Sequence, residues 1–262
     1  MRIALAQTPG FQEPEENLAV VADKAREAAG RGASLVVFPE ASSQAFGTGR
    51  LDTRASGLDG EFPRGVLGLS RELGITIVVG IFRPADTVER GEKTINRVSN
   101  TALIAASGEA IVYDKIHTFD ALGNRESDTV RPGTELVTFS HEGVRVGVAV
   151  CFDIRYPEQF RGLARRGAEL VVLPTSWAAG EGKLEQWRGL HPARALDSGA
   201  FILAADHALP GGPTTGPTGI GRSVAVAPNG TVLAEAGEGP ELLVVDIDPG
   251  DAAEQRRELP IL

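Results

Sequence analysis

The chain carries one strand–helix pattern twice, and this internal repeat limits its fold more than any other feature. The run Gly-Ala-Ser-Leu-Val-Val-Phe-Pro at 32–39 is echoed by Gly-Ala-Glu-Leu-Val-Val-Leu-Pro at 167–174, each after a helical stretch that ends in an Arg-Gly pair. A Ser-Gly turn at 107–108 is matched in the second half by an Asn-Gly turn at 229–230, which is a strong hairpin signal. The repeat therefore predicts a layered α/β fold made of two related halves.

The expected elements alternate between short apolar strands and amphipathic helices. In the first half we expect strands at 3–7, 35–38 and 75–81, helices at 15–29 and near 65–73, and a hairpin of 101–106 with 110–113. In the second half we expect a strand at 146–150 equivalent to 3–7, a helix from about Pro157, and a hairpin over 223–234. Two such halves would most simply pack sheet on sheet with helices outside, as a four-layer αββα sandwich, although one wide doubly wound sheet fits the same pattern.

No serine- or proline-rich linker separates the halves, so we expect residues 1–262 to form a single domain. The glycine-rich stretch 211–221 is expected as a surface loop near a site. The tail 249–262 is polar and ends in Leu-Pro-Ile-Leu, which leaves two interpretations open. Its apolar end docks on a neighbouring copy at a dimer interface, or it forms a plain surface strand.

Composition excludes several classes of protein. Acidic residues outnumber basic ones by 35 to 26, and this net charge of −9 lacks the basic footprint of nucleic-acid binding. No apolar run reaches the ~18 residues of a membrane span, and no leader pattern opens the chain, so we expect a soluble cytoplasmic protein that binds neither nucleic acid nor membranes. The single cysteine rules out an internal disulfide. Lysines are scarce, which raises the question of why an amine was kept at Lys24, Lys93, Lys115 and Lys183.

Three residues that can do chemistry stand at the ends of three predicted strands, the edge where α/β proteins build their sites. Cys151 follows 146–150 at a strand-to-helix turn, where a thiol would be exposed beside helix N-terminal amides. Glu40 ends a buried-type strand, and Lys115 ends a hairpin strand. Structural interpretations remain open: a packed core cysteine, a carboxylate bound to loop amides, and a solvated lysine paired with Asp114.

Three segments around these residues resemble the signature segments of the nitrilase superfamily of carbon–nitrogen hydrolases. They are Val-Val-Phe-Pro-Glu at 36–40, Tyr-Asp-Lys-Ile-His at 113–117 and Val-Cys-Phe-Asp-Ile-Arg-Tyr-Pro-Glu at 150–158. The resemblance extends over nearly the whole chain. It implies an αββα sandwich that usually dimerises, so a homodimer or higher homo-oligomer is expected.

The resemblance also implies roles for individual residues. Cys151 would be the nucleophile, Glu40 the general base, and Lys115 the cation that stabilises the oxyanion, with the Phe152 amide completing the oxyanion hole. Glu126 matches a second glutamate that family members often carry on the loop after the lysine. That loop is short here, so the sequence leaves open how Glu126 reaches the site.

The implied activity is cysteine-dependent hydrolysis of a small carboxamide to an acid and ammonia through a thioester. Phe152, where true nitrilases of the superfamily usually carry tryptophan, favours an amide over a nitrile. Nitrile or N-carbamoyl hydrolysis, a non-catalytic scaffold, and a redox-sensing thiol remain alternatives. We expect Trp177 to be a wall of the pocket, with a core tryptophan as the alternative, and Arg155 to form a structural pair with Glu158.

Other chemistries find little support in the sequence. The Ser-containing segment 221–225 lacks the final glycine of a serine-hydrolase elbow, and 47–52 fails the last position of a dinucleotide fingerprint. The four histidines, at positions 117, 141, 191 and 207, have no metal-ligand spacing. We therefore expect no metal and no other cofactor.

Overall fold

The strands of the protein form two six-stranded sheets in the computed structural model, which describes residues 1–210 and 218–262. The first sheet has the order β12-β1-β2-β3-β4-β5 and the second has the order β11-β10-β9-β8-β7-β6. The strands are β1 (Arg2–Gln7), β2 (Leu35–Val37), β3 (Thr76–Arg90), β4 (Lys93–Ala106), β5 (Glu109–Asp114), β6 (Thr138–His141), β7 (Val144–Val148), β8 (Leu170–Pro174), β9 (Phe201–Ala205), β10 (Val224–Val226), β11 (Val232–Glu235) and β12 (Glu241–Asp246). The α-helices are α1 (Pro14–Gly30), α2 (Glu61–Leu73), α3 (Pro157–Arg165), α4 (Lys183–Ser198) and α5 (Gly250–Glu258).

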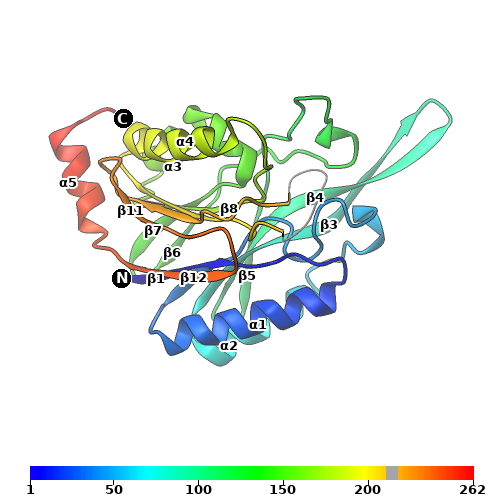
Figure 1. Ribbon diagram of the computed structural model, residues 1–262, viewed down its shortest axis with the longest axis horizontal. Coiled ribbons are helices and arrows are strands. Elements are labelled where there is room, and N and C mark those ends of the chain that lie inside the picture. The colour runs from blue at the N-terminus through cyan, green and yellow to red at the C-terminus, as the bar shows by residue number, and fades with distance from the viewer. Residues whose placement is uncertain (211–217) are drawn as a thin grey trace.

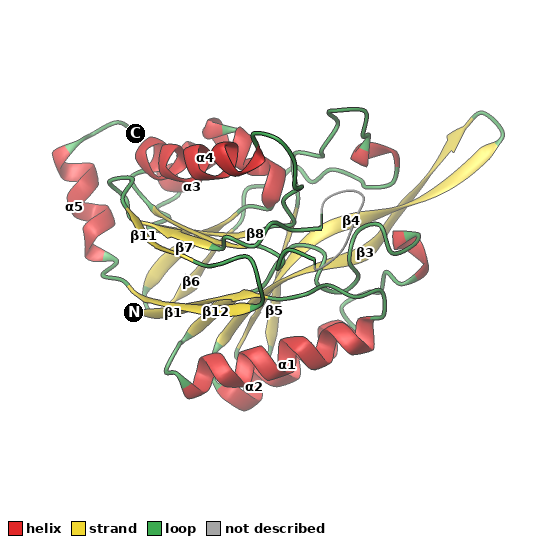
Figure 2. Cartoon of the chain, in the orientation of Figure 1, coloured by secondary structure: helices red, strands yellow, loops and turns green. Residues whose placement is uncertain are grey.

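The molecule has four layers (Figure 1). Helices α1 and α2 cover the outer face of the first sheet, α3 and α4 cover the outer face of the second, and the sheets pack against each other between them (Figure 2). The expected four-layer αββα sandwich is confirmed. The alternative of one wide sheet is wrong, because the described strands pair within two separate sheets.

The internal repeat extends through the whole topology. Strands β1 to β5 occupy the same order as β7 to β11, and β12 and β6 take the sixth place in their sheets. In each half the first three strands are parallel, with Ile3 beside Leu35 in one register and Val146 beside Leu170 in the other. The echoed segments thus supply the equivalent strands β2 and β8. In both cases the strand follows a glycine with positive φ, which lets the chain leave the preceding helix.

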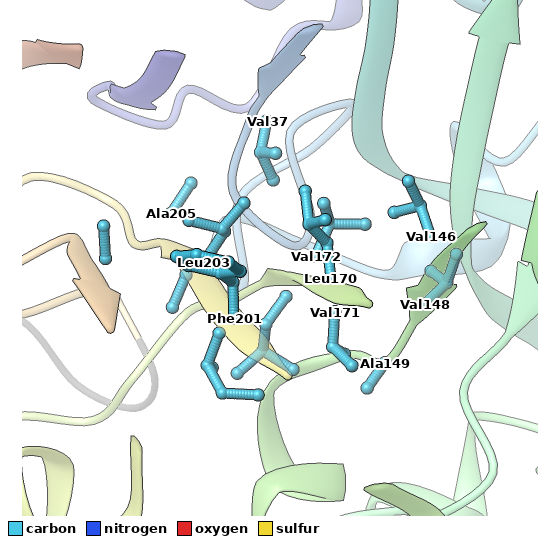
Figure 3. Packing of buried hydrophobic residues seen from close by; sticks show 14 of the residues in the cluster. Val37, Val146, Val148, Ala149, Leu170, Val171, Val172, Phe201, Leu203 and Ala205 are labelled. Carbon is cyan, nitrogen blue, oxygen red and sulfur yellow. The ribbon is translucent and has the colours of Figure 1, made fainter. Parts of the chain in front are cut away.

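Alternating side chains of the strands pack toward two different layers, as the period of two requires. In β1, Ile3 and Leu5 belong to the core between the sheets, whereas Ala4 and Ala6 pack with the helices outside. Figure 3 shows the core between the sheets, where Val37 of β2 points toward side chains of β8 and β9. This packing fixes the end of β2 close to the end of β8.

Two elements run beyond their expected bounds. Helix α2 begins at Glu61 and not near residue 65, because Pro63 lies in the first turn, where a missing N–H costs no helical hydrogen bond. Strands β3 and β4 extend past the core into a long hairpin arm that turns at Gly91, whose φ is +61° (Figure 1). Residues 83–98 lack the apolar pattern of a buried strand, so the sequence analysis did not predict this arm.

The structure excludes one of the two interpretations of the C-terminal tail. Residues 250–258 form helix α5, so a plain surface strand is wrong, and Leu259, Ile261 and Leu262 are exposed. Of the expected loop 211–221, residues 211–217 lie outside the described residues. No helix among the described residues is long and apolar enough to cross a membrane.

Candidate active site

A cavity of about 230 Å³ opens where strand ends from both sheets meet. Glu40, Cys151 and Trp177 each stand three residues past the end of β2, β7 and β8, and Lys115 directly follows β5. All four line the cavity, together with Glu126 and Phe152. The fold therefore brings every predicted site residue to one cavity.

Cys151 occupies a tight turn between β7 and α3. Its φ of +44° lies in the left-handed region, where a residue with a side chain is strained. A short 3₁₀ helix, Cys151–Arg155, continues the turn, and Pro157 starts α3 at a position that suits its fixed φ. Cys151 as a whole is 8% exposed, and its thiol donates to the carbonyl oxygen of Ser176, 3.8 Å away. Cys151 is thus buried as the core interpretation required, yet it faces the cavity.

The surroundings of the Cys151 thiol favour its protonated form. Burial raises its pKa well above the ordinary value, the Glu40 carboxylate adds to this rise, and the Lys115 ammonium opposes it. Because only a thiolate is a strong nucleophile, attack on a substrate needs a base that takes the thiol proton.

Glu40 is held by its backbone from both sheets. Pro39 lies between β2 and Glu40, and the Glu40 N–H donates to the Thr175 carbonyl beyond β8 at 3.2 Å. The Glu40 carbonyl accepts from Nε2 of His207 at 2.8 Å. Gly80 of β3 makes room for this segment, because a Cβ there would lie 2.5 Å from the Glu40 Cα.

The Lys115 ammonium lies between two carboxylates. Its Nζ donates to Oε1 of Glu40 at 2.9 Å, and to Oε2 and Oε1 of Glu126 at 2.9 and 3.1 Å. The Phe119 N–H donates to Oε2 of Glu126 at 2.6 Å, which fixes that side chain. The short loop therefore does carry Glu126 to the site. The open interpretation of Lys115 as a solvated partner of Asp114 is wrong.

Asn100 completes this network, and the sequence analysis missed it. Its Nδ2 donates to Oε1 of Glu40 at 2.7 Å and to Oε1 of Glu126 at 3.0 Å, so one amide bridges both carboxylates. Asn100 lies within β4, in a buried polar run Ser-Asn-Thr that directly precedes apolar residues. A run of three polar residues at the start of a predicted strand was the sequence signal that could have pointed to Asn100.

The pKa values of Glu40 and Lys115 are both raised, but for different reasons. Burial raises the pKa of Glu40 above 4.5, and Lys115 only partly opposes this. Burial alone would lower the pKa of Lys115, but Glu126 and Glu40 outweigh it and raise that pKa well above its usual value. Lys115 is therefore a fixed positive charge, whereas Glu40 is a carboxylate that gains a proton more readily than an exposed glutamate.

Asp153 fastens the Cys151 turn to the segment that carries Lys115. It accepts from the Val150 N–H at 2.8 Å within the turn and from the Tyr113 hydroxyl at 2.6 Å. Its other oxygen accepts from the His117 N–H at 3.0 Å and lies 2.8 Å from His117 Nδ1. One buried carboxylate thus joins the Cys151 turn to the residues on both sides of Lys115.

Aromatic rings form the outer wall of the cavity. Phe119 and Phe152 meet edge to face, with ring centroids 5.0 Å apart, and Trp177 packs on the core ring of Trp187. Trp177 is therefore both a wall of the cavity and a buried core residue.

The expected pair of Arg155 with Glu158 is wrong. Arg155 lines the cavity, its guanidinium carbon lies 5.2 Å from the Trp177 ring centroid, and it donates to Gln186. Glu158 is exposed on the first turn of α3 and forms no ion pair among the described residues.

Within residues 1–210 and 218–262, no cluster of three or more His, Cys, Asp or Glu side chains could hold a metal ion. Three of the four histidines are buried and bonded inside the fold. His141 lies 3.0 Å from the hydroxyls of Ser34 and Thr76, and His191 and His207 contact backbone carbonyls.

Comparison with known proteins identifies the family. The model of the carbon–nitrogen hydrolase family matches residues 2–257. A protein of Mycobacterium tuberculosis described as a hydrolase is 44% identical over 100% of this chain and 94% of its own. A deaminated glutathione amidase of Escherichia coli O157:H7 is 31% identical, covering 100% of this chain and 96% of its own.

A solved structure has the same fold. An amidase from Nesterenkonia sp. AN1 superposes with a TM-score of 0.80 and 32% identity, over 98% of this chain and 97% of that one. A glutamate-to-leucine variant of that amidase carries the acetamide moiety of fluoroacetamide covalently on its active-site cysteine. The family model, the relatives and the fold confirm the resemblance seen in the three sequence segments. This chain belongs to the carbon–nitrogen hydrolase family, in the amidase branch of the nitrilase superfamily.

Proposed function

We propose that the protein hydrolyses a small carboxamide to a carboxylic acid and ammonia through a thioester on Cys151. One observation carries this proposal: the Cys151 thiol, the Glu40 carboxylate and the Lys115 ammonium line one buried cavity. At roughly 30 Å³ for each water molecule in the liquid, about 230 Å³ suits a small molecule and excludes a folded peptide segment.

In the first step the thiol proton moves to Glu40 and the sulfur attacks the amide carbon. The carbonyl oxygen becomes an oxyanion beside the Lys115 ammonium and the Phe152 N–H, and one well-placed donor of this kind is worth ~3–4 kcal/mol of barrier. Glu40 then gives its proton to the nitrogen, the C–N bond breaks, and ammonia leaves. The acyl group remains on sulfur as a thioester.

In the second step water replaces ammonia. Glu40 takes a proton from water, the hydroxide attacks the thioester carbon, and the C–S bond breaks. The carboxylic acid leaves, and the proton returns to the sulfur, so that the enzyme regains its thiol and Glu40 its charge. Proton transfer by one carboxylate in both steps matches its raised pKa.

Glu126 has a positioning role in this proposal. It binds the Lys115 ammonium through both oxygens and leaves one Nζ contact to Glu40. A carboxylate so placed keeps the amine protonated and directed to the cavity, where the oxyanion forms.

The relatives support an amide as the substrate. An omega-amidase of Danio rerio is 30% identical over 99% of this chain and 92% of its own. The Nesterenkonia amidase in its glutamate-to-glutamine form shows Michael addition of acrylamide at the active-site cysteine. Nitrile or N-carbamoyl hydrolysis would use the same three residues, so assays with those substrates belong in the same test.

The test is ammonia release from a panel of short amides, nitriles and N-carbamoyl compounds. We expect the wild-type protein to release ammonia from at least one amide and the Cys151→Ala protein to lose this activity by a factor of roughly 10³ or more. Equal rates for the two proteins across the panel would contradict an enzymatic role and favour a scaffold.

We further propose a homodimer in the cytoplasm. Three apolar side chains at the end of the tail 249–262, Leu259, Ile261 and Leu262, are at least 41% exposed, and burial against a second copy would cover them. A nucleophilic thiol without a partner cysteine also suits a reducing compartment. Light scattering of the full chain and of a form ending at Glu258 tests the dimer, and cell fractionation tests the location.

A further inference from the structure

Asp206 is a buried carboxylate that the proposed mechanism does not use. It directly follows the apolar strand β9, has no exposed surface and does not line the cavity. No cation is paired with it within residues 1–210 and 218–262, and the segment 211–217 contains no ionisable side chain. Because an unpaired buried carboxylate is costly in free energy, hydrogen bonds must offset its burial.

Two backbone amides hold this carboxylate, one on each oxygen. Oδ1 of Asp206 accepts from the Trp177 N–H at 2.8 Å, and Oδ2 accepts from the Ile220 N–H at 2.8 Å. The backbone of Asp206 is fixed as well, since its N–H donates to Oγ of Ser223 at 3.0 Å. Both carboxylate oxygens therefore act as acceptors, and this arrangement suits the ionised form of the side chain.

A single peptide group connects Asp206 to the Cys151 thiol. The carbonyl of Ser176 and the N–H of Trp177 belong to the same planar trans peptide, so they point in opposite directions. The thiol donates to that carbonyl, 3.8 Å away, and the N–H donates to Asp206. A hydrogen-bonded chain thus runs from the S–H through one peptide to the buried carboxylate. A negative charge at the N–H end polarises the peptide and makes its carbonyl oxygen a stronger acceptor for the S–H.

The segment 175–177 that Asp206 holds also positions Glu40. Strands β8 and β9 are parallel with Pro174 beside Ala205, and this register places Asp206 next to Thr175. The Thr175 carbonyl accepts from the Glu40 N–H at 3.2 Å. The thiol and the backbone of the proposed base therefore both form hydrogen bonds with the segment that Asp206 fixes.

The charge of Asp206 changes near neutral pH. Burial raises its pKa to about 7, although the hydrogen bonds from Ile220 and Trp177 oppose this rise. Burial is also the largest cause of the raised pKa of the Cys151 thiol, and the charge of Asp206 adds to it. The thiolate is therefore less favoured once the pH rises above about 7 and Asp206 ionises.

The other charged groups that act on the thiol are already placed. Glu40 raises the pKa of Cys151 beyond the effect of burial, and Lys115 lowers it. Lys183 also interacts with the thiol. His207 follows Asp206 in the sequence, but its ring nitrogens contact the carbonyls of Thr8 and Glu40. Of these side chains, only Asp206 reaches the thiol through the Ser176–Trp177 peptide.

We propose that Asp206 is a positioning residue for the nucleophile: through the Ser176–Trp177 peptide it holds the Cys151 S–H in place and keeps the thiol protonated until Glu40 takes the proton. The effect on turnover rests on the proposed amide hydrolysis. The effect on the thiol does not, because it exists in the protein without substrate and can be measured there.

The experiment compares iodoacetamide alkylation of Cys151 in the wild-type and Asp206→Asn proteins across pH. Asparagine keeps the shape of the side chain and removes its charge. Below about pH 6 both side chains are neutral, so we expect the ratio of variant to wild-type rates to stay constant. Above about pH 8 only the wild type carries the charge, and the ratio should rise roughly threefold or more because the variant forms more thiolate.

Two further variants complete the comparison. Asp206→Ser is smaller and neutral, and it provides the same test if Asp206→Asn does not fold. Ser70→Ala is the control for a loss of buried hydrogen bonds, because the Ser70 hydroxyl is buried in α2 and bonds to the carbonyls of Ile75 and Ala105. This variant should be less stable than the wild type, but its alkylation ratio should not change with pH.

Turnover provides a second measurement for Asp206→Asn. We expect kcat for an amide substrate to fall roughly tenfold or more, because hydrogen bonds to a charged group that fix the segment 175–177 are lost. KM should change much less, since Asp206 does not line the cavity.

The outcomes separate this inference from the proposed function. An alkylation ratio that does not change with pH in the Asp206 variants would overturn the role of Asp206, because a purely structural change does not follow its charge. A wild-type protein that hydrolyses no amide faster than Cys151→Ala would overturn the proposed hydrolysis, whereas the alkylation ratio would still report on Asp206.

Discussion

At the scale of single residues, the site combines two carboxylates with one ammonium in a buried place. Lys115 can balance only one of the two negative charges, and the Asn100 amide stabilises both carboxylates by donating a hydrogen bond to each. Burial makes this arrangement costly in free energy, and the raised pKa of Glu40 records that cost. The same raised pKa suits the alternation of Glu40 between base and acid that we propose.

The acid side of the pH profile should report Glu40. The base must be ionised, and burial raises its pKa above 4.5, so activity is lost as pH falls through that raised pKa. We expect kcat/KM to fall on the acid side with an apparent pKa above 4.5. Alkylation of Cys151 by iodoacetamide should lose its corresponding acid limb in the Glu40→Gln protein. Identical labelling profiles in the two proteins would show that Glu40 does not govern the thiol.

Asn100 offers a second residue-scale prediction. Its donation lowers the pKa of Glu40, so Asn100→Ala should move the acid limb of kcat/KM to higher pH. The lost hydrogen bonds to charged oxygens should also reduce kcat/KM roughly tenfold to a hundredfold. Asn96→Ala, in the exposed hairpin arm, is the matched control. An unchanged pH profile in Asn100→Ala would mean that the bridge is only structural.

The residues that the sequence predicts and those it misses differ in one physical respect. Glu40, Lys115 and Cys151 stand within three residues of strand ends, so each ionisable side chain interrupts a mainly apolar run and is visible in the sequence. Asn100 lies inside a strand and is neutral, so its role depends on neighbours 26 and 60 positions away in the chain. Arg155 was paired with Glu158 because the two are near in sequence, whereas its real contacts come from α4 and the rings of the wall.

At the scale of elements, strand ends and the turns after them set the geometry of the site. Gly80 of β3 illustrates this, because its backbone N–H donates to the Pro39 carbonyl at 3.0 Å while its missing side chain leaves room for Glu40. A methyl group there would displace the segment between β2 and the Glu40 carboxylate.

Gly80→Ala should therefore reduce both stability and activity. A Cβ 2.5 Å from backbone atoms of residues 40 and 41 forces the chain to shift, which costs on the order of 1–3 kcal/mol or more. Gly68→Ala is the control, since Gly68 lies in α2 with no atom within 4 Å of its Cβ position, and it should stabilise by ~0.5–1 kcal/mol. Urea unfolding and kcat/KM of both proteins check the prediction; equal behaviour would show that the approach at Gly80 is not tight.

The Asp153 junction between the Cys151 turn and the lysine segment gives a further prediction. Asp153→Asn replaces an acceptor oxygen with an NH₂ group that faces donors, so we expect a loss of ~1–3 kcal/mol in the free energy of unfolding and a fall in kcat. Asp246→Asn, which removes an exposed ion pair with Arg2, should leave the free energy of unfolding nearly unchanged, because solvent screens exposed ion pairs. The account of the junction is wrong if the two variants are equally stable and active.

The bounds of helices and strands could be predicted where the element packs in the core, and less well where it is exposed. The strand at 3–7 follows from a short apolar run, and the turn at 107–108 follows from a Ser-Gly pair, both of whose residues have positive φ. The arm of β3 and β4 beyond residue 82 lies outside the main core, so no apolar pattern marks it. The start of α2 was placed too late, since the proline there belongs to a helix start and not to a break.

At the scale of the whole molecule, the last strand of the chain lies at the edge of the first sheet, beside the first strand. β12 pairs antiparallel with β1 along six residue pairs, so the C-terminal strand completes the sheet that the N-terminal strand begins. β6, which precedes β7 directly, takes the equivalent place in the other sheet. The first half therefore depends on residues at the far end of the sequence.

Truncation should show this dependence. Removal of 241–262 would leave β1 as an exposed strand edge beside a buried core, and we expect that protein to aggregate or lose its cooperative unfolding transition. Removal of 259–262 alone should leave the transition of the full chain within a few degrees in Tm. A soluble, cooperatively folded chain ending at residue 240 would contradict the closing role of β12.

The duplication was visible in the sequence because both copies of the echoed strand kept an apolar run between glycine and proline. The sequence does not show as clearly which sheet each strand joins. No segment next to β12 in the sequence predicts its pairing with β1. We propose that 1–262 is one domain, and a single transition in both circular dichroism and tryptophan fluorescence would support this.

The most direct test of the account is the mass of the intact protein after acid quench during turnover of an amide. We predict an added mass equal to the amide minus ammonia, located on Cys151 by peptide mapping and absent from the Cys151→Ala protein. Rapid release of ammonia with no such adduct, and at the same rate in Cys151→Ala, would contradict the thioester mechanism.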